Sequence, residues 1–262
     1  MTSDFKTLHQ IHKGKITDKW QQYLSSYDAI LSPYKNQKIN LLEIGVQNGG
    51  SLEVWSKYFV DAQHIIGCDI NPQCGDLVFD DSRLRLFVGD ASQEKTYQTI
   101  LEPTMSFNII IDDGSHTSRD IIHNFALYFN NLRDGGVYII EDLHCSYWQE
   151  FGGGLYHPYS AMTFLKSLVD VIHYEHWGLA LDNHAVLREF YQYYGSDFSV
   201  DLSHIHSVEF INSICVIKKQ PPTDNELGIR CVSGETGLIS SKDNYPDRQK
   251  NKPADQNSSS YR

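Results

Sequence analysis

Two short apolar runs, each followed at once by acidic residues, constrain the fold of this chain more than any other feature. The runs cover residues 107–111 and 137–140, and the acidic motifs after them are Asp112-Asp113-Gly114-Ser115-His116 and Glu141-Asp142. Short runs rich in β-branched residues are typical of buried parallel strands, and residues 118–130 between them have helical spacing. A strand–helix–strand unit crosses over right-handed with its strands side by side. Four carboxylates and one histidine are therefore expected to meet at one sheet edge.

The carboxyl edge of such a sheet suits a metal ion. Open α/β sheets bind their ligands beyond the carboxyl ends of the strands, and carboxylate oxygens are the donors that hard divalent cations prefer. Adjacent residues at a strand end point to opposite sides. We therefore expect one of Asp112 and Asp113 to face a cofactor and the other to face a metal ion.

The upstream half of the chain predicts three more strands that end in acidic residues at the same edge. These strands are expected over residues 38–46, 64–70 and 83–88. The first carries Glu43-Ile44-Gly45-Val46 at its end, the second carries Asp69, and the third runs into Gly89-Asp90. An acid about 24 residues after the glycine of such a turn, as Asp69 is after Gly45, commonly binds the hydroxyl groups of a ribose.

A glycine-rich turn, Gln47-Asn48-Gly49-Gly50-Ser51, follows the first strand and leads into a helix expected over about residues 52–58. Glycines permit the tight turn and the close backbone approach that a bound ligand needs. The turn lacks the Gly-x-Gly-x-x-Gly spacing of dinucleotide sites, and it has no basic residue for a phosphate. A nucleoside without phosphates is the ligand that this edge favours.

These residues resemble the successive cofactor motifs of class I S-adenosylmethionine-dependent methyltransferases. Within that class, the two acidic motifs resemble those of the magnesium-dependent sugar O-methyltransferases of the mycinamicin group, and of sequences described as cephalosporin-hydroxylase-like. The resemblance covers about residues 15–219. The motifs that carry it are Glu43-Ile44-Gly45, Asp69, Gly89-Asp90, Asp112-Asp113-Gly114-Ser115-His116 and Glu141-Asp142-Leu143-His144-Cys145-Ser146-Tyr147-Trp148.

The resemblance implies an α/β fold of the Rossmann-like kind, with a mostly parallel seven-stranded sheet in the order 3-2-1-4-5-7-6 and helices on both faces. Residues 203–211 and 214–219 read as the last two strands, and Asn212-Ser213 between them is a tight-hairpin signal. The expected division is an N-terminal helical cap over residues 1–36, the methyltransferase domain over 37–219, and a flexible polar tail or linker over 220–262.

The resemblance also implies a role for each residue of the acidic edge. S-adenosylmethionine is the implied cofactor, and Mg²⁺ or Mn²⁺ is the implied metal ion. The implied metal ligands are Asp113, Glu141 and Asp142, and His116 is the implied general base, with His144 and His123 as alternatives. Asp69 is expected at the ribose and Asp90 nearer the adenine. The full cofactor-binding set is Glu43, Gly45, Gly49, Ser51, Asp69, Asp90, Ala91 and Asp112.

Two further segments are expected near the site. A helix over residues 17–35 carries apolar residues at helical spacing and would cover the cofactor. The loop over residues 144–160 places aromatic residues around Gly152-Gly153-Gly154, which would let it close. Aromatic faces stack on sugars, so His144, Tyr147 and Trp148 are candidate substrate-binding residues. The alternative is that these aromatic residues fill the core beneath a helix over residues 160–174.

Charge and composition limit the partners. The formal net charge is −11 without a basic stripe, which argues against a nucleic acid substrate. A membrane span and a signal peptide are not expected, so a cytoplasmic location is predicted. The five scattered cysteines disfavour structural zinc and disulfides. The predicted partner is a small-molecule glycoside or saccharide, and homo-oligomerisation is left open.

Magnesium-dependent methyl transfer to a sugar hydroxyl is the predicted function. A catechol-type or other small-molecule O-methyltransferase is the nearest alternative, but the catechol enzymes typically have an asparagine where this chain has consecutive acids. A non-haem iron hydroxylase would need two histidines and one carboxylate, and His173-Tyr174-Glu175 offers the matching pair. A non-catalytic methyltransferase-like binding domain is the third alternative.

Overall fold

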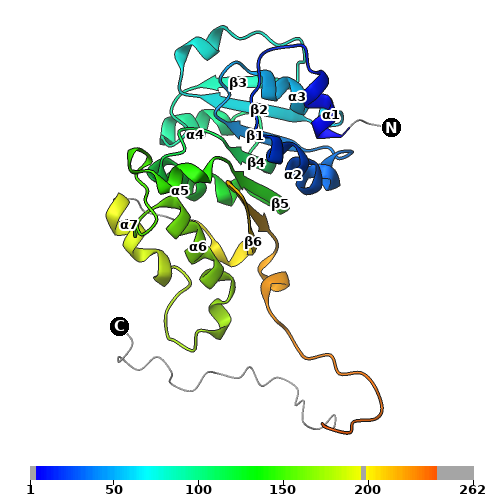
Figure 1. The fold of residues 1–262 in the computed structure, drawn as a ribbon, viewed down its shortest axis with the longest axis vertical. Coiled ribbons are helices and arrows are strands. Elements are labelled where there is room, and N and C mark those ends of the chain that lie inside the picture. The colour runs from blue at the N-terminus through cyan, green and yellow to red at the C-terminus, as the bar shows by residue number, and fades with distance from the viewer. Residues whose placement is uncertain (1–3, 196–198, 241–262) are drawn as a thin grey trace.

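The computed structural model describes residues 4–195 and 199–240 and contains one seven-stranded sheet in the order β3-β2-β1-β4-β5-β7-β6 (Figure 1). The strands β1 to β5 are parallel to one another, whereas β7 runs antiparallel to both β5 and β6. This arrangement confirms the predicted α/β fold and its strand order. The bounds are Asn40–Ile44 for β1, His64–Asp69 for β2, Leu84–Val88 for β3, Phe107–Asp112 for β4, Leu132–Ile140 for β5, Ile205–Ile211 for β6 and Ile214–Lys219 for β7.

Helices cover both faces of the sheet, and each face has its own hydrophobic core. The helices α1, α2 and α3 pack on one face, whereas α4, α5, α6 and α7 pack on the other (Figure 1). The strands serve both cores because consecutive side chains alternate: in β4, Ile109 belongs to the first core and Ile110 to the second. The bounds are Phe5–Ile11 for α1, Gln21–Leu31 for α2, Gly50–Tyr58 for α3, Glu94–Leu101 for α4, Ser118–Tyr128 for α5, Ala161–Ile172 for α6 and Arg188–Tyr194 for α7.

The N-terminal segment differs from the helix predicted over residues 17–35. The chain forms α1, then an irregular stretch over residues 12–20, here called the N-terminal strap, and then α2. The strap crosses the start of α3 so closely that a Cβ on Gly50 would lie 2.2 Å from the carbonyl oxygen of Lys15. Residues 15 and 16 thus pack against α3, and the helix begins at Gln21, four residues later than predicted.

Asp69, at the end of β2, holds the glycine turn that follows β1. Its carboxylate accepts backbone N–H hydrogen bonds from Val46, Gln47 and Asn71, each at 2.8 Å. Burial alone would raise the pKa of Asp69, but these donors outweigh burial and hold that pKa below its ordinary value of 3.8. The acid is thus part of the scaffold that shapes the turn.

The polar tail predicted over residues 220–262 falls partly outside the described residues. Up to residue 240 the tail contains the short turn Pro222–Asn225 and otherwise irregular backbone. Residues 241–262, and residues 1–3 of the predicted N-terminal cap, lie outside the described residues. Within residues 4–195 and 199–240, no helix has the length and apolar character needed to cross a membrane.

Replacing Asp69 with alanine should destabilise the fold by about 1.5 kcal/mol, the lower end of the range for hydrogen bonds to a charged group, because the carboxylate is partly exposed. The pKa of Asp69 is depressed in the folded protein, so this contribution is complete above pH 3.8 and is lost as the pH falls through the folded-state pKa. Urea unfolding should therefore give a constant difference from wild type between pH 7 and pH 5.

The control for this variant is Asp76→Ala, which removes an exposed carboxylate from the turn after β2. It should change the free energy of unfolding by less than about 0.5 kcal/mol. Equal effects of the two substitutions, or a loss of the Asp69 contribution already between pH 7 and pH 5, would contradict the bracing role of Asp69.

Candidate active site

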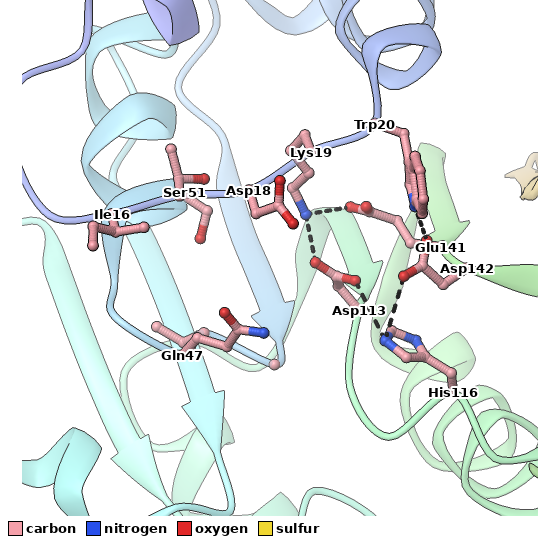
Figure 2. Close-up of a pocket in the computed structure, with 13 residues that line it drawn as sticks. Ile16, Asp18, Lys19, Trp20, Gln47, Ser51, Asp113, His116, Glu141 and Asp142 are labelled. Atoms are coloured by element: carbon pink, nitrogen blue, oxygen red, sulfur yellow. Dashed lines mark hydrogen bonds and ion pairs between the residues drawn. The ribbon is translucent and has the colours of Figure 1, made fainter. Parts of the chain in front are cut away.

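A pocket of about 100 Å³ lies at the carboxyl ends of β1, β4 and β5, against the N-terminal strap (Figure 2). Its walls come from the strap, the glycine turn and both acidic motifs. Gly45 permits this convergence: its φ is +87°, and a Cβ there would lie 2.0 Å from the backbone oxygen of Asp113. The lining residues are Ile16, Thr17, Asp18, Lys19, Trp20, Gly45, Val46, Gln47, Ser51, Asp113, His116, Glu141 and Asp142.

The acidic motifs enclose a buried lysine, Lys19 of the strap, which the sequence did not predict. Its Nζ lies 2.5 Å from Asp113 Oδ2 and 2.7 Å from Glu141 Oε1 (Figure 2). It also lies 4.0 Å from Glu43 Oε1. The Lys19 side chain is 3% exposed. Burial alone would lower the pKa of Lys19, but the three carboxylates hold that pKa well above its ordinary value of 10.5. Lys19 is therefore a charged ammonium group.

Aromatic side chains of α2 and the strap complete the hydrogen bonding of Glu141 and Asp142. The Tyr27 hydroxyl donates to Glu141 Oε1 in the buried interior. The Tyr23 hydroxyl donates to Asp142 Oδ1 at 2.8 Å, and the Trp20 indole N–H donates to the same oxygen at 3.0 Å. The N-terminal segment thus fixes both acids of the second motif.

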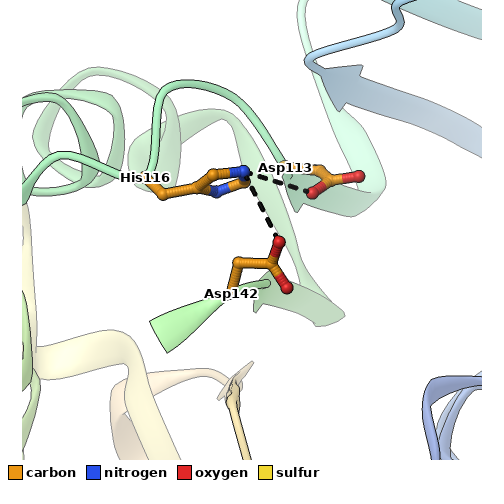
Figure 3. A group of neighbouring side chains, drawn as sticks. All are labelled: Asp113, His116 and Asp142. Atoms are coloured by element: carbon orange, nitrogen blue, oxygen red, sulfur yellow. Dashed lines mark ion pairs between the residues drawn. The ribbon is translucent and has the colours of Figure 1, made fainter. Parts of the chain in front are cut away.

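Asp113, His116 and Asp142 form a compact group on the open side of this cluster (Figure 3). One ligand atom from each lies within 4.8 Å of the others. His116 Nε2 is 3.6 Å from Asp142 Oδ2 and 4.0 Å from Asp113 Oδ1. His116 and Asp142 both have left-handed backbone, with φ of 57° and 54°. Such conformations in non-glycine residues are strained and gather at functional sites.

Asp112 points away from this group. It is buried, and its carboxylate accepts a hydrogen bond from Asn124 of α5 at 3.1 Å. Burial raises the pKa of Asp112 to about 7. Asp112 therefore lies on the α5 side while Asp113 lines the pocket, so the two acids face different surroundings as the strand alternation predicted. The cofactor contact of Asp112 stays a prediction.

Four of the predicted cofactor-binding residues belong to the glycine turn and the strand before it. Gly45 and Ser51 line the pocket. The Ser51 hydroxyl donates to Glu43 Oε2 at 2.7 Å, and Glu43 is fully buried beneath the pocket. Gly49 has a φ of 82° immediately before α3. Glu43 therefore supports the turn from below, and its predicted contact with a cofactor stays a prediction.

The other predicted cofactor-binding residues follow β2 and β3. Asp69 holds the glycine turn, as described above. Asp90 accepts hydrogen bonds from the backbone N–H and the hydroxyl of Ser92 at 2.9 and 2.7 Å. Ala91 is buried, and its carbonyl accepts a hydrogen bond from Tyr128 at 2.9 Å. The ribose and adenine contacts of these residues also stay predictions.

His144 lies beside the pocket between two indole rings. Its ring centroid is 5.8 Å from that of Trp20 and 5.1 Å from that of Trp148, with edge-on geometry in both pairs. His144 Nδ1 is 2.6 Å from Ser213 Oγ at the β6–β7 hairpin. The strap and the loop over residues 144–160, here called the aromatic loop, therefore meet across His144, next to the acidic edge.

The three candidate bases occupy different places. His116 lines the pocket, with its Nε2 3.6 Å from Asp142 Oδ2. His144 lies outside the pocket lining, where its Nδ1 is 2.6 Å from Ser213 Oγ and 4.0 Å from Asp142 Oδ1. His123, in α5, lies edge-on to the ring of Tyr194 in α7. Among these three histidines, the geometry favours His116 for a role at the acidic edge.

The aromatic loop divides between solvent and core. Tyr147 and Trp148 are 43% and 47% exposed, so they remain available to a ligand. Tyr159 instead stacks on Tyr193 at a centroid distance of 4.1 Å and packs against the core of the α5–α7 face. Tyr159 thus fills the core, as the alternative interpretation expected, whereas substrate binding by Tyr147 and Trp148 stays a prediction.

The residues considered for an iron site lie elsewhere. His173-Tyr174-Glu175 follows the end of α6, and a Glu175 oxygen accepts the backbone N–H of Leu227 at 2.8 Å. The group at the acidic edge has one histidine and two carboxylates, the reverse of the iron oxygenase triad. The arrangement favours a hard, oxygen-preferring cation over iron.

Comparison with known proteins places this site in a family. Residues 42–143 match a family model described as a methyltransferase domain. Mycinamicin VI 2''-O-methyltransferase of Micromonospora griseorubida is 36% identical over 160 residues, which make up 57% of this chain and 39% of that protein. A tetracenomycin rhamnosyl 2'-O-methyltransferase of Streptomyces olivaceus is 32% identical over 168 residues, or 60% of this chain and 43% of that protein. The chain thus spans less than half the length of these curated relatives.

Solved structures agree with the sequence matches. A MycE methyltransferase from the mycinamycin biosynthetic pathway, in complex with Mg, SAH and mycinamycin VI, has a TM-score of 0.69 and 26% identity, covering 84% of this chain and 54% of that chain. A second crystal form with Mg and SAH has a TM-score of 0.70. With the strand order and the acidic edge, these matches show that the chain carries a class I S-adenosylmethionine-dependent methyltransferase domain of the mycinamicin type.

Proposed function

We propose that this protein transfers a methyl group from S-adenosylmethionine to a hydroxyl group of a sugar, with Mg²⁺ bound at the acidic edge. The observation that carries the proposal is the convergence of Asp113, His116 and Asp142 in one pocket with the glycine turn. The names of the relatives support it, since the first two are O-methyltransferases that act on glycosylated natural products.

The donor set fits a hard divalent cation. Asp113 and Asp142 are each about a fifth exposed and present carboxylate oxygens near His116. Glu141 completes the proposed ligand set of Asp113, Glu141 and Asp142, although its Oε1 already accepts hydrogen bonds from Lys19 and Tyr27. Mn²⁺ has the same preference for oxygen donors and is expected to substitute for Mg²⁺.

The same edge supports binding of the methyl donor. The glycine turn gives a close backbone approach to the pocket, and Asp69 and Asp90 stand at the ends of the next two strands. In the proposed arrangement Asp69 binds the ribose through the carboxylate that also shapes the turn, and Asp90 lies nearer the adenine. S-adenosylmethionine would supply an electrophilic methyl group on its sulfonium. The methyl carbon would bond to the acceptor oxygen as its bond to sulfur breaks, and the sulfur would leave as a thioether.

The main obstacle to this reaction is the proton on the acceptor hydroxyl, because a protonated alcohol is a weak nucleophile. A bound divalent cation lowers the pKa of a hydroxyl group that it contacts. His116 is placed to take the proton, since its Nε2 faces the pocket between Asp113 and Asp142. Both carboxylate oxygens lie beyond hydrogen-bond distance of Nε2, at 4.0 and 3.6 Å, so this nitrogen can serve as the proton acceptor in the proposed reaction.

The acceptor is proposed to be the sugar of a glycoside. Trp148, Tyr147 and Trp20 are exposed aromatic residues next to the acidic edge, and aromatic faces stack on the apolar faces of sugar rings. The relatives are named for mycinamicin, rhamnosyl tetracenomycin and olivosyl oleandolide acceptors. Deoxysugar glycosides are therefore the first acceptors to test.

The protein should bind S-adenosylmethionine without a metal ion but methylate only with Mg²⁺ or Mn²⁺, because the glycine turn and the acidic group are separate parts of the pocket. Calorimetry in EDTA measures the affinity for S-adenosylmethionine without a metal ion. Methylation of a panel of rhamnosides, olivosides and macrolide glycosides, in EDTA and after Mg²⁺ is restored, measures the dependence of turnover on the metal ion. Full turnover in excess EDTA would contradict the proposed requirement for a metal ion.

The His116→Ala variant should keep its affinity for Mg²⁺ and S-adenosylmethionine but lower kcat by about 10²- to 10⁴-fold, as expected for a lost general base. The matched control is His144→Ala, which should change KM for the glycoside more than kcat, because His144 lies beside the pocket. Near-normal turnover of His116→Ala, or a larger fall in kcat for His144→Ala, would assign the base to His144 instead.

A further inference from the structure

Lys19 is the one cation in contact with the carboxylates of the pocket, among the residues that the structure describes. Its ammonium group lies within 4.0 Å of Glu43, Asp113 and Glu141. The side chains of Glu43 and Glu141 are at most 2% exposed, so solvent water screens their electrostatic interactions only weakly. Lys19 therefore supplies the positive charge beside these acids and donates hydrogen bonds to two of them, Asp113 and Glu141.

Lys19 and the open side of the pocket use different oxygens of Asp113. Lys19 contacts Asp113 Oδ2, whereas Asp113 Oδ1 faces His116 (Figure 2). The ligand atoms of Asp113, His116 and Asp142 also come together without any contribution from Lys19. The geometry therefore leaves room for the ammonium group on one oxygen and for a metal ion on the other.

The strap holds Lys19 in place from both sides. On one side, the Lys15 backbone N–H donates to Glu53 of α3 at 3.0 Å. The backbone of the strap also lies directly over Gly50. On the other side, the Trp20 indole donates to Asp142 at 3.0 Å. The chain on both sides of Lys19 is therefore held, which limits where its side chain can place the ammonium group.

We propose that Lys19 is a permanent positioning residue of the metal site: it stays bound to Asp113 and Glu141 when the metal ion binds, and it holds their carboxylates in the binding arrangement. This inference rests on the proposed function, since it assumes that the acidic edge binds a divalent cation. It also makes the order of the strap depend on the same acids that bind the metal ion. The opposite possibility is that Lys19 occupies the metal position and has to be displaced.

The Lys19→Met variant distinguishes a Lys19 that positions the metal ligands from a Lys19 that competes with the metal ion. Calorimetry with Mg²⁺, and with Mn²⁺ as a second probe, should show affinity weakened by about 10- to 100-fold, the range for loss of a residue that orients metal ligands. Lys19→Arg should recover most of this loss because it restores a cation. The matched control is Lys15→Met, which removes the ion pair of Lys15 with Glu53 from the same strap and should bind both ions as wild type does.

Three outcomes would overturn the inference. Equal or tighter ion binding by Lys19→Met would make Lys19 a competitor of the metal ion. Equally weak binding by Lys19→Arg would show that the charge is not responsible. A loss in Lys15→Met equal to that in Lys19→Met would assign the effect to the strap in general. If the wild-type protein binds neither ion, the proposed function fails together with the inference, and that result is distinct from the other three.

A second measurement needs no variant. Hydrogen exchange of the amides of residues 12–20 in the wild-type protein should slow when Mg²⁺ is added, because a fixed Lys19 and a bound ion hold the same carboxylates from opposite sides. Displacement of Lys19 would instead free the strap, and exchange there would become faster. Faster or unchanged exchange at an Mg²⁺ concentration that saturates the site would overturn the proposal.

Discussion

The repulsion among carboxylates at one sheet edge is the constraint on which the rest of the site depends. Parallel strands deliver the residues that follow them to the same edge, so Asp113 and Glu141 come together there. Charges this close in a buried setting need a compensating cation. Lys19 provides it, and the path of the strap, the position of α2 and the bonds of its tyrosines are all compatible with keeping that cation in place.

The sheet itself could be predicted because its signals are local. Apart from Asn108, residues 107–111 and 137–140 are apolar without alternation, as strands buried on both faces are, and each run leads into an acidic motif. The observed β5 is longer than predicted because it begins at Leu132, before two glycines that weaken the strand pattern. The strand order, in contrast, followed from the family resemblance, since the hairpin at Asn212-Ser213 alone does not place the last two strands beside β5.

The strap and Lys19 could not be predicted because their signals are not local. Trp20, Tyr23, Leu24 and Tyr27 have helical spacing, and nothing in residues 17–20 marks the point where the helix begins. Lys19 is 94 positions from Asp113 and 122 from Glu141, so no motif joins them. One signal was available: the two acidic motifs hold several carboxylates and no lysine or arginine, which indicates a cation from another part of the chain, although charge alone does not say which residue supplies it.

The position of Trp20 links the chemistry of the edge to the recognition of an acceptor. Its indole N–H binds Asp142, a proposed metal ligand, while its ring meets His144 beside the exposed Trp148. A side chain bound in this way cannot move to fit an acceptor without also changing the surroundings of Asp142. The sheet fixes the acids and the strap fixes Trp20. In the loop after β5, Tyr147 and Trp148 are exposed, and within the described residues neither forms a hydrogen bond with a proposed metal ligand. Substitutions that change acceptor preference are therefore easiest to accommodate in that loop. A substitution in that loop can change the preferred acceptor while leaving the proposed metal ligands in place, whereas a substitution in the strap would alter both.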